Sequence, residues 1–126
     1  MILFNPVLDM THEKIIARLH GDESLARKIS PYHHLRKNGP PTLILFRTND
    51  RLLQQAPPFI AKAKELGNRV ELYTAEGQQH GFFNQSPWLE RTIERMDQFL
   101  VEIGYLSRRP TTQTAGQNPP ASRPAQ

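Results

Sequence analysis

Three short runs of mainly apolar residues predict the strands of one sheet. Residues 1–4 and 42–46 are nearly continuous in their apolar character, whereas residues 69–74 alternate between apolar and polar positions. Continuous runs are typical of strands buried on both faces, as in a parallel sheet, and alternation is typical of a half-exposed strand. We therefore expect two buried strands, followed by a third that lies nearer the periphery.

Helical patterns follow the second and third runs. Residues 58–66 place apolar side chains on one face, and Gly67 suits the position just after a helix end. Residues 87–103 repeat apolar side chains at steps of three and four. Here Ser86 is the predicted N-cap, and Pro87 is the predicted first helical residue.

The segment between the first two runs is less regular. Thr11 is the predicted cap of a short helix that contains residues 15–19, and Asp22 is the predicted cap of a second one that ends before Pro31. The resulting order is strand, helical excursion, strand, helix, strand, helix. This alternation predicts an α/β fold with a mostly parallel sheet and covering helices.

The end of the chain differs in composition from the rest. Of the 126 residues, those from 107 to 126 are rich in Pro, Thr, Gln, Ser and Ala, with no large apolar side chain. Such a segment cannot bury enough apolar surface to offset the entropy of ordering it. We expect residues 1–106 to form the folded domain and residues 107–126 to be a disordered tail.

Charge and composition narrow the classes of function. The net charge is +4, but Arg108, Arg109 and Arg123 lie in the tail, which leaves 16 − 3 = 13 basic against 12 acidic residues in the rest. This near neutrality gives no support for nucleic-acid binding. No apolar run approaches the roughly 18 residues of a membrane span, and no signal peptide is recognisable, so a cytoplasmic location is expected. The absence of cysteine excludes disulfides and thiolate metal sites.

Two ionisable side chains follow the second and third predicted strands. Asp50 comes four residues after Phe46, and His80 comes six residues after Thr74. In a parallel sheet both loops open at the carboxyl edge, where reactants usually bind. A carboxylate can there orient an imidazole whose other nitrogen takes a proton from a nucleophile. The spacing alone leaves open that Asp50 merely caps the next helix and that His80 is an ordinary loop residue.

The sequence around both side chains resembles that of α/β-hydrolases. Residues 40–50 (PPTLILFRTND) resemble the acid-bearing strand and loop, and residues 76–84 (EGQQHGFFN) resemble the histidine loop. The likeness is to the esterase and prolyl-oligopeptidase-like (dienelactone-hydrolase-like) branch. Residues 3–9 (LFNPVLD) and 30–34 (SPYHH) resemble segments that precede the acid in that branch. The likeness covers about residues 1–106 and keeps the order of acid before histidine.

This resemblance implies the C-terminal half of an α/β-hydrolase, with about three mostly parallel strands. Asp50 would be the triad acid and His80 the general base for a small ester or acyl substrate, with no cofactor or metal required. We expect the two side chains to lie within hydrogen-bonding reach. Arg47 stands where the family usually has glycine, so it could displace Asp50, or pair with it and compete with His80.

The family's nucleophile is missing from this sequence. In the family a Gly-x-Ser-x-Gly motif lies upstream of the segment matched here, and none of the five serines has glycines two residues to either side. The serines are Ser24, Ser30, Ser86, Ser107 and Ser122. We therefore expect the chain to be inactive alone, with the serine supplied by an upstream region or another polypeptide.

Other interpretations remain open. The chain could be a non-catalytic fragment or remnant that binds a partner, or a second copy, through the exposed edge of its N-terminal strand. An independent ligand-binding α/β module would need a phosphate-binding glycine loop, which is not found. His33 and His34 have no third ligand nearby, so no metal site is expected. Trp88 could line a pocket beside His80 or simply pack the start of its helix.

Overall fold

Three parallel strands form the sheet that organises the molecule. The computed structural model describes residues 1–107, so the predicted disorder of the tail lies outside the described residues. The strands run β1 (Ile2–Phe4), β2 (Thr42–Arg47) and β3 (Val70–Ala75), and they lie in the order β1-β2-β3. Both pairs are parallel. The predicted parallel α/β architecture is therefore confirmed.

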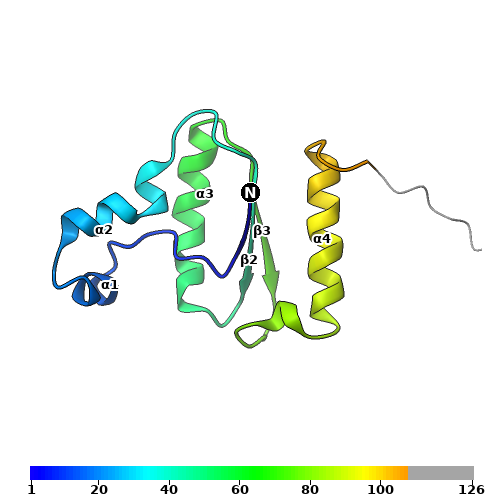
Figure 1. Ribbon diagram of the computed structural model, residues 1–126, viewed down its shortest axis with the longest axis horizontal. Coiled ribbons are helices and arrows are strands. Elements are labelled where there is room, and N and C mark those ends of the chain that lie inside the picture. Colours follow the sequence, from blue (N-terminus) through cyan, green and yellow to red (C-terminus); the bar gives the residue numbers. More distant parts are fainter. Residues whose placement is uncertain (108–126) are drawn as a thin grey trace, which may run out of the picture.

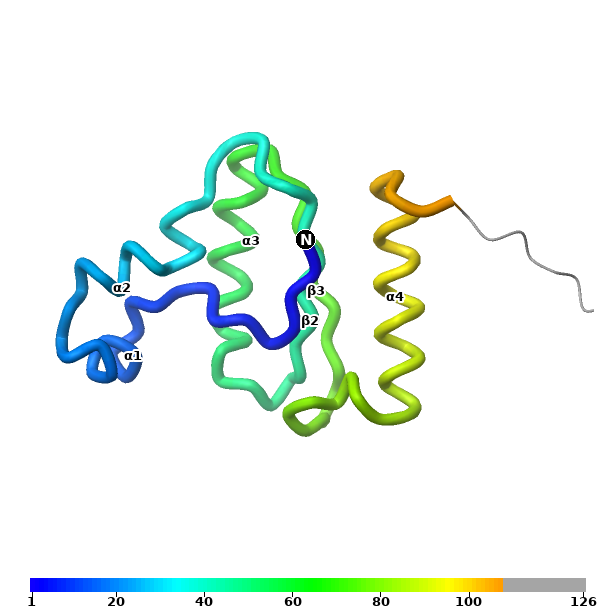
Figure 2. The backbone as a smooth tube through the Cα atoms, viewed as in Figure 1, coloured from blue at the N-terminus to red at the C-terminus, as the bar shows by residue number. Residues whose placement is uncertain are grey.

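Helices cover the two faces of this sheet, as Figures 1 and 2 show. One long helix, α3, packs on one face and the other, α4, on the opposite face, while α1 and α2 extend beyond α3. Short 3₁₀ turns connect these parts. The bounds are α1 Glu13–Arg18, α2 Glu23–Ile29, η1 Pro31–His34, η2 Arg51–Gln55, α3 Ala56–Glu65, η3 Phe82–Asn84 and α4 Trp88–Glu102.

The central strand β2 contributes side chains to two separate cores. Ile44 and Phe46 point into a core with α3, and Leu43 and Leu45 point into a core with α4. All four side chains are fully buried, which explains the continuous apolar run in the sequence. Each such burial contributes roughly 1.5–3 kcal/mol of transfer free energy.

Two predicted helix caps differ from the observed ones, and the reason is local. Thr11 does not cap α1, because its hydroxyl donates to the Asp9 carboxylate at 2.7 Å, and the His12 imidazole occupies the cap position instead. Ser86 does not cap α4, because its hydroxyl donates to the Glu90 side chain, and the helix begins at Trp88. The prediction for Asp22 is confirmed, since it accepts from the Leu25 amide at 2.8 Å.

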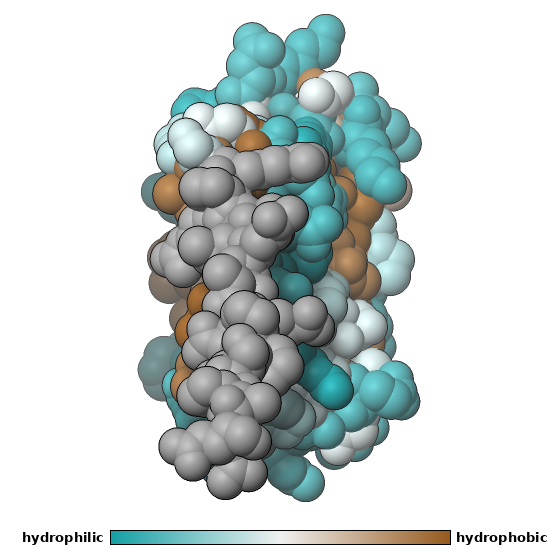
Figure 3. Space-filling view, turned by 90° about the vertical axis from the view of Figure 1, so that its right-hand side faces the viewer, coloured by the Kyte–Doolittle hydropathy of each residue, from teal (hydrophilic) through white to brown (hydrophobic). Residues whose placement is uncertain are grey.

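The side of the molecule that carries α4 is shown in Figure 3, where hydrophobic strips interrupt a mainly hydrophilic surface. Ile93 on α4 and Leu106 after it are each more than 40% exposed, at 45% and 43%.

Among the helices of residues 1–107, none has both the length and the apolar character needed to span a bilayer.

Candidate active site at the carboxyl edge

The loops that follow β2 and β3 are bonded to each other. The Thr48 amide donates to the Ala75 carbonyl at 3.0 Å, and the Gly77 amide donates to the Thr48 hydroxyl at 2.9 Å. Asp50 lies two residues beyond Thr48, and His80 lies three residues beyond Gly77. The fold therefore brings the two predicted site residues to adjacent loops at one edge of the sheet.

Asp50 is held by contacts within its own loop. Its Oδ1 accepts from the Leu52 amide at 2.9 Å, which caps η2, and its Oδ2 accepts from the Arg47 Nε at 3.1 Å. The Asp50 side chain is only 9% exposed. Asp50 does cap the following helical turn, and of the two effects expected of Arg47, pairing with Asp50 is the one observed.

His80 lies in the turn that follows β3, and its side chain is exposed. The turn closes through Gly81, whose φ of +82° lies in the left-handed region that favours glycine. The next residue, Phe82, is buried at 5% exposure against the α4 core. His80 thus stands on a turn whose backbone is fixed by its neighbours, while its imidazole is free to contact other groups.

A direct contact between Asp50 and His80 is not formed. Within residues 1–107, neither imidazole nitrogen of His80 comes within 4.0 Å of an Asp50 carboxylate oxygen. Both carboxylate oxygens instead accept hydrogen bonds from within the loop, from Arg47 and from the Leu52 amide, and these bonds set the orientation of the carboxylate. The two loops lie side by side as predicted, but Asp50 and His80 are not hydrogen-bonded to each other. The catalytic role of the two residues stays a prediction.

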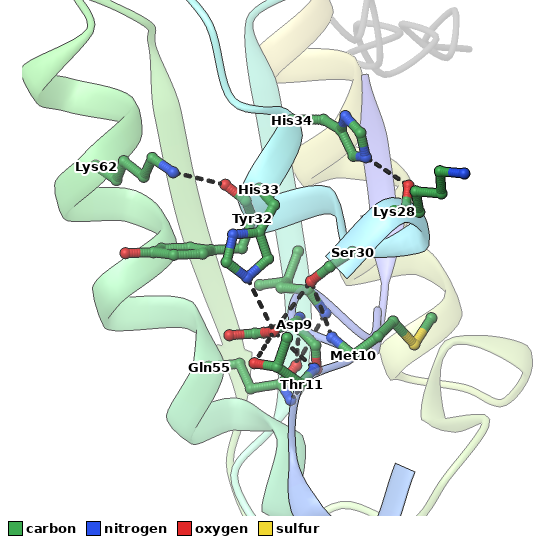
Figure 4. Close-up of polar contacts among 11 residues, drawn as sticks. Asp9, Met10, Thr11, Lys28, Ser30, Tyr32, His33, His34, Gln55 and Lys62 are labelled. Atoms are coloured by element: carbon green, nitrogen blue, oxygen red, sulfur yellow. Dashed lines mark hydrogen bonds and ion pairs between the residues drawn. The ribbon is translucent and has the colours of Figure 1, made fainter. Parts of the chain in front are cut away.

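A second carboxylate, Asp9, follows β1 and lies in a denser cluster, drawn in Figure 4. Its Oδ1 accepts from the Thr11 amide at 2.9 Å, the Thr11 hydroxyl at 2.7 Å and the Ser30 hydroxyl at 3.0 Å. The His33 Nε2 lies 4.0 Å from the same oxygen. Burial raises the pKa of Asp9, but the hydrogen bonds from Thr11 and Ser30 and the charge of His33 outweigh it, so the pKa is lowered overall.

Asp9, Ser30 and His33 do not form a catalytic triad despite their residue types. In a triad the imidazole stands between the acid and the hydroxyl, whereas the Ser30 hydroxyl donates directly to Asp9. Ser30 is also fully buried, and its oxygen accepts from the Met10 amide at 2.9 Å. The bonds of Ser30 to Asp9 and Met10 hold together the start and the end of the segment that contains α1 and α2.

Gln55 ties this cluster to the loop of Asp50. Its Oε1 accepts from the Leu8 and Asp9 amides at 2.9 and 3.1 Å, and its Nε2 donates to the Asp9 carbonyl at 2.8 Å. Gln55 ends η2, the 3₁₀ turn that Asp50 caps. Sequence reasoning missed this bridge, because 47 positions separate Gln55 from Leu8 and no local pattern marks the pair.

The chain is similar to solved structures of an esterase. No protein-family model and no curated protein matches it, but solved structures of Thermogutta terrifontis esterase 2 do. The form phosphoramylated by tabun is 39% identical with a TM-score of 0.72, and the match covers 86% of this chain and 42% of the esterase. The form phosphonylated by sarin is 36% identical with a TM-score of 0.74, and the match covers 86% of this chain and 45% of the esterase. The propionate-bound form is 37% identical with a TM-score of 0.73, and the match covers 86% of this chain and 44% of the esterase.

The chain has the fold of part of an α/β-hydrolase, similar to that of this esterase. The chain spans less than half the length of the esterase that it matches, in agreement with the expected half of such a protein. The sequence resemblance to esterases is confirmed. The likeness to the prolyl-oligopeptidase-like branch stays a prediction.

The remaining candidate side chains have structural contacts. His33 lies toward Asp9, whereas the His34 Nε2 lies 2.5 Å from the Lys28 carbonyl oxygen, so the two adjacent rings diverge (Figure 4). In the described part of the chain, no three His, Asp or Glu side chains are grouped as metal ligands. Trp88 packs edge-on against Phe82, with ring centroids 5.8 Å apart, and also lines a hollow of about 290 Å³ beside His80.

Proposed function

We propose that the chain is the C-terminal portion of a serine hydrolase that cleaves an ester or similar acyl bond. In this proposal Asp50 is the triad acid and His80 is the general base. The observation that carries it is the placement of both residues on bonded loops at the carboxyl edge, in a chain that shares 37% identity with a propionate-bound esterase.

The proposed chemistry assigns one step to each side chain. His80 takes the proton from a serine hydroxyl as the serine oxygen attacks the acyl carbon, and then gives it to the departing alkoxide. A water molecule repeats the attack on the acyl-serine and releases the acid. Asp50 accepts a hydrogen bond from the Nδ1–H of His80, which leaves Nε2 free to carry the proton.

The nucleophile has to come from a polypeptide segment outside this sequence. None of the five serines lies in a Gly-x-Ser-x-Gly motif, and Ser30 is fully buried with its hydroxyl committed to Asp9. We therefore expect the isolated chain to hydrolyse p-nitrophenyl acetate no faster than its His80→Ala variant.

The proposed substrates are esters of short carboxylic acids. The matched esterase was solved with propionate and with butyrate bound. The hollow beside His80, at about 290 Å³, is compatible with a small acyl or leaving group, and its lining includes Gln79, Gln85 and Trp88. Longer acyl chains would extend beyond such a hollow into solvent or onto the missing portion of the hydrolase.

A chimera tests this proposal. The chain would replace the segment that it matches in Thermogutta terrifontis esterase 2, and hydrolysis of p-nitrophenyl propionate would be followed. We expect turnover that His80→Ala removes and that the control Glu76→Ala leaves in place, since the Glu76 side chain is exposed after the same strand and does not line the hollow. A folded chimera in which His80→Ala changes nothing would contradict the role of His80.

A second candidate function is a non-catalytic one, in which the chain binds a partner through the sheet edge at β1. Two observations favour it: Asp50 is paired with Arg47 rather than His80, and β1 is bonded on one side only within residues 1–107. The apolar strand Ile2–Phe4 contains no proline or lysine that would block pairing. Analytical ultracentrifugation of the chain at high micromolar concentration should then show a dimer, whereas a monodisperse monomer would count against it.

A further inference from the structure

We infer that Arg47 is a positioning residue that decides whether Asp50 can pair with His80. The inference rests on the proposed function, in which these two side chains are the acid and the base. It goes further by assigning a regulatory role to a third side chain, one that does not touch the substrate.

The geometry shows how firmly Arg47 holds the acid. Its Nε donates to the Asp50 Oδ2 at 3.1 Å, and the two side chains are 23% and 9% exposed. Partial burial of both groups reduces the screening of their charges by water. The Arg47 backbone is itself fixed, because it ends β2 and its amide donates to the Asn5 Oδ1 at 3.1 Å.

The competition between Arg47 and His80 for Asp50 is unequal. An arginine side chain is always protonated and offers a planar set of donors, whereas histidine changes its charge near neutral pH. The arginine is three positions from Asp50, so the pair forms within one turn of chain. His80, on the neighbouring loop, would have to approach a carboxylate whose orientation is already set by Arg47 and the Leu52 amide.

Removing the guanidinium would leave the acid free to turn without unfolding its loop. The Oδ1 of Asp50 still caps η2 through the Leu52 amide, while Oδ2 loses the Arg47 Nε, its one hydrogen-bond donor within residues 1–107. The bond between Thr48 and Gly77 keeps the two loops together. Asp50 and His80 lie two and three residues beyond this bond, on the two loops that it joins.

The tautomer of His80 can show whether its imidazole is hydrogen-bonded to Asp50. The residues that line its hollow are Gln78, Gln79, Gly81, Phe82, Gln85, Ser86, Pro87 and Trp88. No charged side chain is among them, so a new hydrogen bond from Nδ1 to a carboxylate would point to Asp50. The tautomer of an imidazole is set by the hydrogen bond that one of its nitrogens makes.

The test is an imidazole ¹H–¹⁵N NMR spectrum of the 126-residue chain and three variants. Arg47→Met removes the guanidinium and keeps an unbranched side chain, and Arg51→Met is the matched control, because Arg51 makes no ion pair within the described residues. We expect Arg47→Met to raise the Nδ1–H fraction of neutral His80 on the order of twofold or more. Arg51→Met should leave it unchanged, and Arg47→Met with Asp50→Asn should return it to the original value.

The inference is overturned if Arg47→Met leaves the His80 tautomer unchanged, or if the change persists in the double variant. Should Arg47→Met fail to fold, Arg47→Gln provides the same comparison with a polar side chain. In the esterase chimera, Arg47→Met should raise kcat/KM about tenfold or more. An active chimera that does not respond to Arg47→Met would overturn this inference and leave the proposed function intact, whereas inactivity of both chimeras would contradict the proposed function.

Discussion

Two carboxylates follow adjacent strands of the sheet, and their surroundings differ. Asp9, after β1, accepts three hydrogen bonds on one oxygen from Thr11 and Ser30 and has His33 at 4.0 Å. Asp50, after β2, accepts one bond on each oxygen and, within residues 1–107, has no imidazole nitrogen within 4.0 Å of its carboxylate. By residue type alone, Asp9 with its serine and histidine looks the more catalytic of the two.

The hydrogen-bond directions reverse that impression. The Ser30 hydroxyl donates to Asp9 from a fully buried position, so the cluster closes a chain segment and offers no reactive oxygen to a substrate. Asp50 stands on a loop that is bonded to the loop of the exposed His80, and its carboxylate is paired with Arg47. The residue types in a cluster are therefore less informative about catalysis than the donor and acceptor of each hydrogen bond.

The largest effect should come from removing the carboxylate of the structural cluster. Asp9→Ala takes away the acceptor of three hydrogen bonds and leaves the buried Ser30 hydroxyl without the acceptor of its proton. We expect a loss of about 2–4 kcal/mol in the free energy of unfolding, measured by urea denaturation. Asp9→Asn keeps an oxygen acceptor and should lose clearly less. Equal losses for both would mean that the hydrogen bonds to Asp9 contribute little.

The corresponding change at the proposed acid should cost less stability. Asp50→Ala removes the cap of η2 and the ion pair with Arg47, and we expect a loss of about 1–2 kcal/mol in the same measurement. Asp50→Asn should retain most of the cap and lose only part of this amount. A loss at Asp50 that exceeds the loss at Asp9 would reverse the distinction between the two carboxylates.

Acid should weaken the fold through Asp9. Its pKa lies below the ordinary value of 3.8 in the folded chain, so the unfolded chain binds the proton more readily. The contribution of Asp9 is therefore present above the unfolded pKa and is lost as the pH falls through the folded pKa. Urea denaturation between pH 5 and about pH 3 should show stability falling, with a shallower fall in Asp9→Asn. Identical slopes in the two proteins would contradict this assignment.

The smallest effect on stability is expected at His80. The side chain is exposed and makes no ion pair within residues 1–107, so His80→Ala should change the free energy of unfolding by less than about 0.5 kcal/mol. Thermal unfolding followed by circular dichroism is sufficient to measure it. A loss of 2 kcal/mol or more would show that the imidazole has a structural partner and would weaken its assignment as a free base.

Local patterns predicted most of the fold but little of the polar bonding. The run at residues 42–46 marks the central strand, because such continuity is typical of a strand buried on both faces. Asp22 was identifiable as a cap, because its partner lies three residues away. The bond from Ser30 to Asp9 joins residues 21 positions apart in the sequence. Helical and strand periodicities describe local structure and do not predict contacts between loops at that separation.

The candidate site was predictable in its residues and not in its geometry. The order of acid and histidine after successive strands locates Asp50 and His80 at one edge of the sheet. Arg47 was recognisable as unusual from the sequence, but two outcomes were open. The structure selects the ion pair, because the end of β2 and the turn at η2 bring the guanidinium and the carboxylate within 3.1 Å.

The central claim is that Asp50 and His80 act together on one acyl substrate. It is tested most directly by the kcat/KM of the Arg47→Met esterase chimera for p-nitrophenyl propionate, with and without Asp50→Asn. Asparagine can keep the cap of η2 but cannot stabilise the imidazolium, so we predict a fall of at least about 100-fold. An Asp50→Asn chimera that remains folded and equally active would contradict the claim.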